Sequence, residues 1–259
     1  MARLFAITRD VSPSIVDCEL THLAREPIDV ERARLQHKEY ERALERLGCT
    51  VMRLPAGSDM PDSVFIEDIA IVFDEVAVVT RPGAVSRRSE IADVAVAVSR
   101  HRPVFHIAAP GTIDGGDVLA VGRSVFVGRT SRTNDNGIDQ LRTALAPYGY
   151  RVRPATVRGC LHLKSAITAI DDRALLANRR WILEEEFADF DLVDVDTAEP
   201  MGANIVRVGP NLLYAAAFPR TLDLLQGRGY AAVTIDVSEI AKAEGAVTCC
   251  SLIFQPGRT

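Results

Sequence analysis

Short apolar runs occur in pairs along most of this chain, and each pair is joined by a few polar or turn-forming residues. The pairs lie at 68–80, 117–128, 165–178 and 204–216, and a single run, CSLIF, follows at 250–254. Paired runs of this length, bounded by turn residues, are typical of β-hairpins. The pattern therefore predicts four hairpins and one last strand.

Helical patterns lie between the hairpins. The clearest one begins after Asp29, a good helix N-cap, and ends before Gly48. Its apolar stripe should face the core and consists of Ala33, His37, Tyr40, Leu44 and Leu47. We therefore expect His37 to be a packed, hydrogen-bonded core histidine rather than a ligand or a catalyst.

Two further helices are predicted within 86–100 and 134–149, and each is followed by a short strand, RPVFHIAA or YRVRPA. The repeated unit of the chain is therefore expected to be strand, strand, helix, strand.

These units follow one another at nearly constant spacing. The polar residues that open them lie at intervals of 46, 48, 42 and 45 residues and are Asp68, Asp114, His162, Asn204 and Cys249. Such a period indicates a repeat architecture, and closing five units into a ring leaves no exposed terminal repeat. We predict an α/β fold, a five-bladed α/β propeller of ββαβ repeats around a pseudo-fivefold axis. Residues 1–259 would form it as a single domain, with the last strand pairing with the first strand, RLFAIT.

Equivalent positions of a ring of repeats converge on its axis, so the five opening residues should meet there. A thiol, an imidazole and carboxylates together suit nucleophilic attack on a cationic carbon centre. Taken singly, Cys249 and His162 are more typical of core residues, and only their shared place in the repeat favours a site. A zinc site formed by Cys249, His162 and Asp114 is the chemical alternative.

Composition and charge narrow the class of protein. The chain has 30 basic and 35 acidic residues, a formal charge of −5 and no Lys/Arg cluster, which argues against nucleic acid or an anionic membrane as a partner. No apolar run approaches the roughly 18 residues that span a bilayer, so we expect a soluble cytoplasmic protein. The cysteines are odd in number, five, and form no CxxC motif, which indicates neither a disulfide framework nor a zinc finger.

Six stretches of the chain resemble one known family. They are PDSVFIEDIA (61–70), TRPGAVSRRSE (80–90), TIDGGDVL (112–119), SRTN (131–134), LHLKS (161–165) and TCCS (248–251). In this order, and together with the QHKEY helix and the chain length, they are similar to the dimethylarginine dimethylaminohydrolases. These belong to the guanidino-modifying, or amidinotransferase, superfamily, whose pentein fold is a five-bladed α/β propeller.

The resemblance implies a role for each matching residue. Cys249 matches the nucleophile, His162 the general acid/base and Asp114 the carboxylate that orients this histidine. The residues implied to bind substrate are Glu67 and Asp68 at the guanidinium, Asp62 near the entrance, Arg87 and Arg132 at the α-carboxylate, and Leu20 in a mobile lid over the substrate. Gly115 and Gly116 would let the chain turn tightly beside the site.

The implied reaction is hydrolysis of Nω-methylated L-arginine, both asymmetric dimethylarginine and monomethylarginine. It gives L-citrulline and dimethylamine or methylamine through a thiouronium on Cys249, with no metal or organic cofactor. The only partner implied is the small guanidino amino acid, and the protein would be a monomer or a homodimer. Other activities of the same superfamily, namely arginine deiminase, agmatine deiminase and amidinotransferase, are the alternatives, as is a non-catalytic propeller that binds other molecules. The segment 11–27 matches least well, and its Glu19 leaves the preferred Nω-substituent open.

Overall fold

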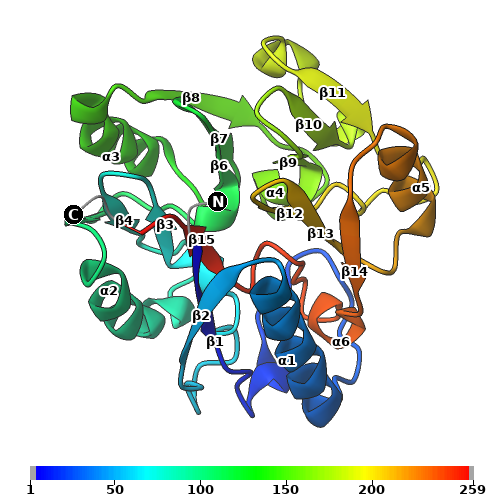
Figure 1. Ribbon diagram of the computed structural model, residues 1–259. Helices are drawn as coiled ribbons and strands as arrows, with labels where there is room; N and C mark the ends of the chain where they lie inside the picture. The colour runs from blue at the N-terminus through cyan, green and yellow to red at the C-terminus, as the bar shows by residue number, and fades with distance from the viewer. Residues whose placement is uncertain (1–3, 257–259) are drawn as a thin grey trace.

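Five three-stranded sheets surround a central axis in the computed structural model, which describes residues 4–256 (Figure 1). Blade 1 contains β1 (Leu4–Arg9), β2 (Cys49–Leu54) and β15 (Leu252–Phe254). Blade 2 contains β3 (Ala70–Val72), β4 (Ala77–Val79) and β5 (Val104–His106), and blade 3 contains β6 (Val118–Val121), β7 (Ser124–Arg129) and β8 (Arg151–Thr156). Blade 4 contains β9 (Ile167–Ala169), β10 (Ala174–Ala177) and β11 (Asp191–Asp194), and blade 5 contains β12 (Ile205–Val208), β13 (Asn211–Ala215) and β14 (Ala232–Ile235).

All five blades have the same strand pattern. In blades 2 to 5 the first two strands form an antiparallel hairpin, and the second strand pairs in parallel with the third. In blade 1 the antiparallel pair is formed by the last strand and the first strand of the chain: β15 pairs with β1, and Phe254 lies opposite Phe5. The predicted closure of the ring by the last strand is therefore confirmed, as is the five-bladed α/β propeller.

The long helices lie on the outside of the ring, whereas the short α4 (Leu163–Ala166) lies near its centre (Figure 1). The parallel crossovers carry α1 (Val30–Arg46), α2 (Ile91–Ser99), α3 (Asp135–Leu145) and α5 (Pro219–Gly227), whereas α4 and α6 (Ser238–Ala241) are short turns. Asp29 caps α1 as predicted, and its side chain accepts a hydrogen bond from Arg32 N. His37 is buried on α1, and burial lowers the pKa of its imidazole. The predicted hydrogen bonding of His37 is only partly right, because its Nε2 atom has no partner among the described residues.

The helix predicted for every unit is missing from blade 4. Residues 178–190, which connect β10 to β11, form two 3-10 helices, Arg179–Trp181 and Glu184–Phe187. Ile182 and Phe187 pack into the core from this connection, and Arg179 bonds back to Asp194 and the Leu192 carbonyl. The segment is too short for a crossover helix of the usual length, so single turns bury its apolar residues instead.

The core consists of five separate apolar clusters, one between each pair of neighbouring blades. Consecutive residues of each middle strand point to opposite faces, so Leu175 of β10 packs toward blade 3 and Leu176 toward blade 5. In β7, Val125 and Phe126 divide in the same way between blades 2 and 4. Because both faces of a blade are covered, its middle strand is a continuous apolar run in the sequence.

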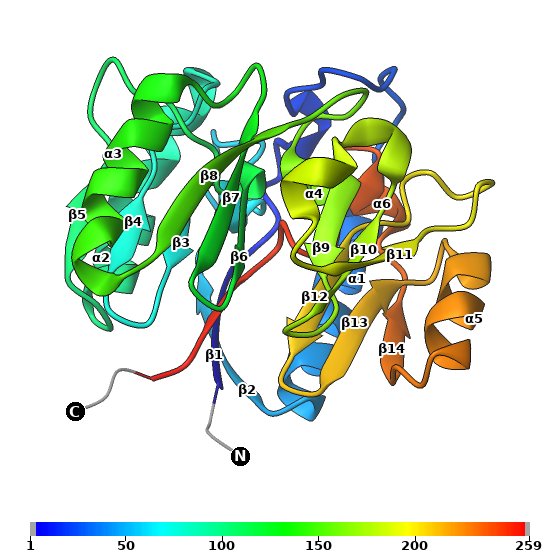
Figure 2. The same ribbon diagram turned by 90° about the horizontal axis from the view of Figure 1, so that it is seen from above.

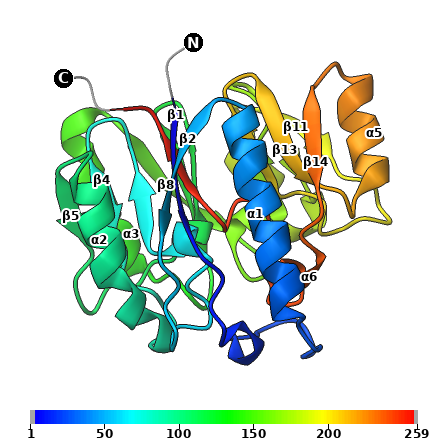
Figure 3. The same ribbon diagram turned by 60° about the horizontal axis from the view of Figure 1, so that its bottom comes forward.

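The two ends of the ring differ. The turn between β12 and β13 lies at one end, and the segment between β1 and α1 lies at the other (Figures 2 and 3). No helix within residues 4–256 is both long and apolar enough to cross a membrane. All five cysteines are free, in agreement with the expectation that the chain has no disulfide framework.

Candidate active site

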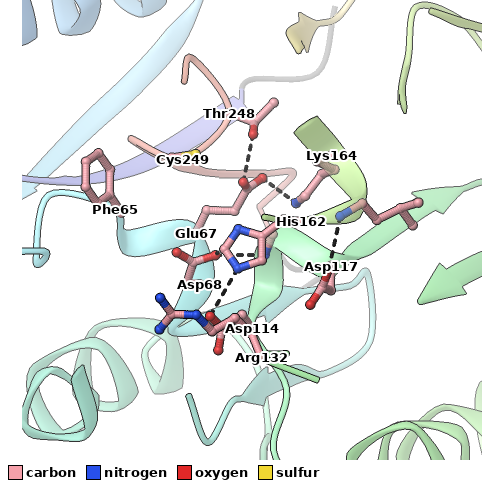
Figure 4. A network of polar contacts seen from close by, with 12 residues as sticks. Phe65, Glu67, Asp68, Asp114, Asp117, Arg132, His162, Lys164, Thr248 and Cys249 are labelled. Atoms are coloured by element: carbon pink, nitrogen blue, oxygen red, sulfur yellow. Dashed lines mark hydrogen bonds and ion pairs between the residues drawn. The ribbon is translucent and has the colours of Figure 1, made fainter. Parts of the chain in front are cut away.

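Three of the five opening residues meet in one buried cluster at the axis of the ring (Figure 4). His162 Nε2 lies 3.1 Å from Asp114 Oδ2, and His162 Nδ1 lies 3.9 Å from Asp68 Oδ1. All three side chains are buried, with Asp114 only 1% exposed. The imidazole is therefore held between two carboxylates that come from different blades.

The other two opening residues lie on the neighbouring side of the axis. Asn204 Nδ2 donates to Thr248 Oγ1 at 3.0 Å, and Asn204 Oδ1 accepts from Thr248 N at 3.0 Å. The carbonyl of the next residue, Cys249, accepts from Glu67 N at 3.1 Å. These bonds connect the chain around Cys249 to blades 2 and 5, so all five residues converge as the repeat spacing predicts.

Short turns at the start of the inner strands present these side chains. Asp68 ends the 3-10 helix Ile66–Asp68 just before β3, and Asp114 precedes the 3-10 helix Gly115–Asp117 just before β6. His162 is the N-cap of α4, which leads into β9. Each unit of the repeat thus turns at the axis before its hairpin begins, and the residue at the turn faces the site.

Gly115 and Gly116 lie in the tight 3-10 turn Gly115–Asp117 beside the site, where the sequence predicts a turn. Neither glycine is among those with a positive φ angle, so the turn itself does not require glycine. A β-carbon on Gly115 would lie 1.9 Å from the Glu67 carbonyl oxygen, and one on Gly116 would lie 2.6 Å from His162 Nδ1. The missing side chains therefore let blades 2, 3 and 4 come together at the axis.

His162 is a cation in the resting site. Burial alone would lower the pKa of the imidazole, but Asp68, Asp114 and Asp117 raise it more, and the net result is a pKa of about 9. Asp68 experiences the converse effect: burial would raise the pKa of its carboxyl, yet His162 and Arg87 lower it below its ordinary value. The site therefore holds a proton at neutral pH that a leaving group can take.

Cys249 is a neutral thiol in the resting site. Burial raises the pKa of this thiol to about 12, and the carboxylates of Glu67 and Asp68 contribute in the same direction. Its Sγ accepts a hydrogen bond from Ala246 N at 3.4 Å. A cation bound between the thiol and the carboxylates would reverse the local charge and favour the thiolate.

We expect alkylation of Cys249 by iodoacetamide to be slow at pH 7 and to rise about tenfold per pH unit up to pH 9, because only the thiolate reacts. The rate is measured by mass spectrometry of the intact protein. A Cys249→Ser variant measured in parallel gives the contribution of the four buried cysteines. A rate that is already constant below pH 8 would contradict the raised pKa.

Arg87 is buried with two carboxylates rather than exposed on the surface. Its Nη1 lies 2.5 Å from Asp68 Oδ2, and its Nε and Nη2 pair with both oxygens of Glu90. Nη2 also bonds to the carbonyls of Asp62 and Phe65. Arg87 therefore fixes the orientation of Asp68, and its assignment to a substrate carboxylate stays a prediction.

Arg132 and the segment 11–27 form the rim of the site. Arg132 is half-buried, and its Nη2 donates to Thr21 Oγ1 at 3.0 Å. Asp62 accepts from Glu19 N, and Glu244 accepts from the backbone N–H groups of residues 21–23. This segment is thus tied to the rim by polar contacts, whereas Leu20 packs against the apolar cluster between blades 1 and 5.

A cavity of about 30 Å³ lies between this segment and the catalytic cluster. Its lining includes the predicted residues Asp62, Asp68, Arg87, Asp114, Arg132, His162 and Cys249, together with Phe65, Glu19 and Glu244. Leu20 and Glu67 are not part of this lining. The space suffices for only one or two water molecules, so the lining of the cavity must rearrange before a larger molecule can enter.

The Glu67 carboxylate points toward Thr248 and Lys164 (Figure 4). Its carboxylate pairs with Lys164 and accepts from Thr248 Oγ1 at 2.7 Å. These three residues line a second cavity of about 260 Å³. Lys164 and Thr248 lie within the LHLKS and TCCS motifs. Their contacts with Glu67 could not be predicted from the sequence, because the three residues belong to different blades.

The side chains that could hold a metal ion differ from the set considered in the sequence analysis. Within residues 4–256, potential ligand atoms of Asp68, Asp114 and His162 all lie within 4.8 Å of one another. Cys249 is not a member of this group. The grouping gives the alternative zinc site of Cys249, His162 and Asp114 no support. The protonated imidazole offsets one of the two carboxylate charges, and Arg87 pairs with Asp68.

Comparisons with known proteins agree with this geometry. No protein-family model matches the sequence. The chain is 40% identical over 257 residues to the N(G),N(G)-dimethylarginine dimethylaminohydrolase of Streptomyces coelicolor, and the match covers 95% of both chains. The structure also resembles the DDAH of Pseudomonas aeruginosa, solved as its C249S mutant complexed with citrulline, with a TM-score of 0.92 and 33% identity over 98% of this chain and 100% of that one.

A second solved structure is that of a dimethylarginine dimethylaminohydrolase H162G adduct with S-methyl-L-thiocitrulline. It has a TM-score of 0.93 and 33% identity, over 98% of this chain and 100% of that one. These similarities extend over nearly the whole chain, and so include all five blades and the residues around the axis. The chain belongs to the dimethylarginine dimethylaminohydrolase family, a family of amidine hydrolases with the pentein fold.

Proposed function

We propose that this protein hydrolyses Nω-methylated L-arginine, that is asymmetric dimethylarginine and monomethylarginine, to L-citrulline and the corresponding methylamine. The observation that carries the proposal is the single small cavity that Cys249, His162 and Asp68 share beneath Arg132. A thiol nucleophile, a protonated imidazole and a carboxylate around one cavity match a reaction at a cationic carbon. We also infer that residues 1–259 act as one catalytic domain, because the site draws on all five blades.

Binding places the planar guanidinium against the carboxylates of Asp62 and Asp68. Burial raises the pKa of Asp62, so a bound cation also stabilises its ionised form. Arg132 pairs with the α-carboxylate at the rim, and Arg87 can add a bond through the second hydrogen on its Nη1. Glu67, which was also predicted to contact the guanidinium, supports the site from behind, through its hydrogen bond to the Cys249 carbonyl.

The first half of the reaction forms a covalent adduct. The bound cation lowers the pKa of Cys249, whose proton passes to solvent because His162 is already protonated, and the thiolate attacks the guanidinium carbon, which becomes tetrahedral. His162 donates its proton to the methylated nitrogen, the C–N bond breaks, and the amine leaves. The product on the enzyme is an S-alkylthiouronium bonded to Cys249, and His162 is now a neutral base oriented by Asp114.

The second half consumes one water molecule. Neutral His162 takes a proton from water, and the resulting hydroxide attacks the thiouronium carbon. The C–S bond breaks, the urea group of citrulline forms, and the hydroxyl proton of the tetrahedral intermediate passes to the departing sulfur, which restores the neutral thiol of Cys249. His162 ends protonated, as in the resting site. Support comes from the relatives: the changed residues in the two solved structures are a cysteine at 249 and a histidine at 162, the same types and numbers as in this chain.

The test is turnover of four guanidines: asymmetric dimethylarginine, monomethylarginine, arginine and agmatine. We expect citrulline from the two methylated substrates in amounts equal to the amine released. Arginine and agmatine form a matched pair, since agmatine lacks the carboxylate for Arg132, and we expect agmatine to give no carbamoylputrescine. Turnover of arginine alone would favour an arginine deiminase, and turnover of none of the four would refute the proposal.

A further inference from the structure

Asp117 is a fully buried carboxylate that the proposed mechanism does not use. It lies at the end of the 3-10 helix Gly115–Asp117, directly beneath His162, and is 0% exposed. Burial raises the pKa of this carboxyl to about 6, while His162 and two threonine hydroxyls oppose that increase. A fully buried carboxylate calls for a structural or functional explanation.

One oxygen of Asp117 accepts two short hydrogen bonds. Thr130 Oγ1 and Thr133 Oγ1 each donate to Asp117 Oδ2 at 2.6 Å, the length typical of a hydroxyl on a carboxylate. Each hydroxyl also accepts a backbone hydrogen bond. Thr130 Oγ1 accepts from Arg132 N at 3.1 Å, and Thr133 Oγ1 accepts from Asp114 N at 3.2 Å. The direction of both hydroxyls is therefore determined, with each O–H aimed at Asp117.

The second oxygen of Asp117 contacts the residue after the acid/base histidine. Leu163 N donates to Asp117 Oδ1 at 3.0 Å, which fixes the start of α4 where His162 is the N-cap (Figure 4). Gly128 of β7 packs so closely that a β-carbon there would lie 2.7 Å from the same oxygen. The carboxylate thus has little room to take another rotamer.

We propose that Asp117 is a positioning residue. It fixes the position of Arg132, which binds the substrate carboxylate, relative to the His162–Asp114 pair. Its three donors lead to the backbone of Arg132, to the backbone of Asp114 and to the residue after His162. Substrate binding and proton transfer therefore depend on the same buried charge, although Asp117 itself touches neither the substrate nor the reacting atoms. The inference deepens the proposed function and rests on it for the kinetic part of its test.

Substituting the two threonines one at a time tests separately the link from Asp117 to Arg132 and the link from Asp117 to Asp114. Thr130→Val removes both bonds of the link from Asp117 to Arg132 and leaves the Thr133 link in place, and we expect KM for dimethylarginine to rise about tenfold while kcat stays within twofold. Thr133→Val removes both bonds of the link from Asp117 to Asp114 and leaves the Thr130 link in place, and we expect kcat to fall about tenfold while KM stays within twofold. Asp117→Asn removes the charge on which both links depend, and kcat/KM should fall about 100-fold.

Three variants serve as controls. Thr130→Ser and Thr133→Ser keep the hydroxyl and should restore the values of the wild-type protein. Thr143→Val makes the same exchange on the exposed face of α3, where the hydroxyl only bonds to the carbonyl of Asp139, and should change neither constant. Thermal unfolding of every variant is measured alongside. Equal losses of kcat in Thr130→Val and Thr133→Val that follow the loss of melting temperature would overturn the proposal in favour of a structural role.

A readout without substrate separates this inference from the proposed function. The ring signals of His162 are followed by NMR in protein with ¹⁵N-labelled histidine and are assigned with a His162→Asn variant. Asp117→Asn and Thr133→Val should shift them, whereas Thr130→Val and Thr143→Val should not. If the wild-type protein turned over no guanidine, the proposed function would fail and the NMR shifts alone would decide the positioning role. Unchanged His162 signals in Asp117→Asn would overturn it.

Discussion

Turnover of dimethylarginine should fall at least about 1,000-fold when Cys249 is replaced by serine, because a hydroxyl next to Glu67 and Asp68 is far harder to ionise than a thiol. The pocket itself should survive, since serine differs from cysteine by one atom and the backbone bonds of Cys249 are unchanged. Binding of L-citrulline, measured by calorimetry, should therefore stay within about threefold of the wild-type value. Citrulline release in steady state measures the turnover.

The neighbouring thiol offers a matched control for this variant. Cys250 is buried in the cluster between blades 1 and 5, and it is not part of the lining of the active-site cavity. Cys250→Ala should lose stability, because a buried side chain leaves a gap, but it should keep the kcat of the wild-type protein at a temperature where it is folded. Full turnover by Cys249→Ser, or equal losses in both variants, would refute Cys249 as the nucleophile.

Replacing His162 with asparagine should lower kcat for dimethylarginine about 100-fold to 10,000-fold, because the amine can then leave only without its proton donor. The loss in the first step should be much smaller for S-methyl-L-thiocitrulline, whose thiol leaving group needs no proton. With this compound the variant should accumulate an adduct on Cys249, since the base that activates water is missing. Intact-protein mass spectrometry after acid quench measures the adduct.

His106→Asn is the control for this exchange, because His106 is exposed in β5, away from the axis. It should leave turnover and adduct formation unchanged. Failure of His162→Asn to accumulate adduct, together with unimpaired turnover of dimethylarginine, would contradict both roles of the histidine.

The pH dependence of the unfolding free energy gives a second measurement of the protonation of His162. The pKa of His162 is raised to about 9 in the folded protein, and an unfolded histidine titrates near 6.5. The contribution of His162 to stability is therefore fully present below pH 6.5 and is lost as pH rises through 9. The unfolding free energy of the wild-type protein should fall over this range, and that of His162→Asn should fall less.

The repeat of the fold could be predicted because its signals are local. Hairpins such as 204–216 are apolar runs around a short turn, and α1 has its cap, its stripe and its terminal glycine within twenty residues. The spacing of Asp68, Asp114 and His162 then placed them at equivalent points of a ring. The helix predicted for blade 4 is wrong because its crossover, residues 178–190, is too short for a helix of the usual length. Its length follows from where β10 and β11 end in the folded blade, and Ile182 and Phe187 reach the core from single turns instead.

The site could be predicted only as far as its residue types. The sequence alone determined which side chains face the axis, Cys249 among them, because a regular repeat brings equivalent positions together. Only the tertiary structure decided how their charges are balanced. Arg87 holds Asp68, and Lys164 holds Glu67 across 97 residues of chain. Asp117 joins the backbones of Arg132 and Asp114 through two threonines. The physical reason is that these pairings depend on distances between blades, and such distances become defined only when the ring closes and excludes water from its axis.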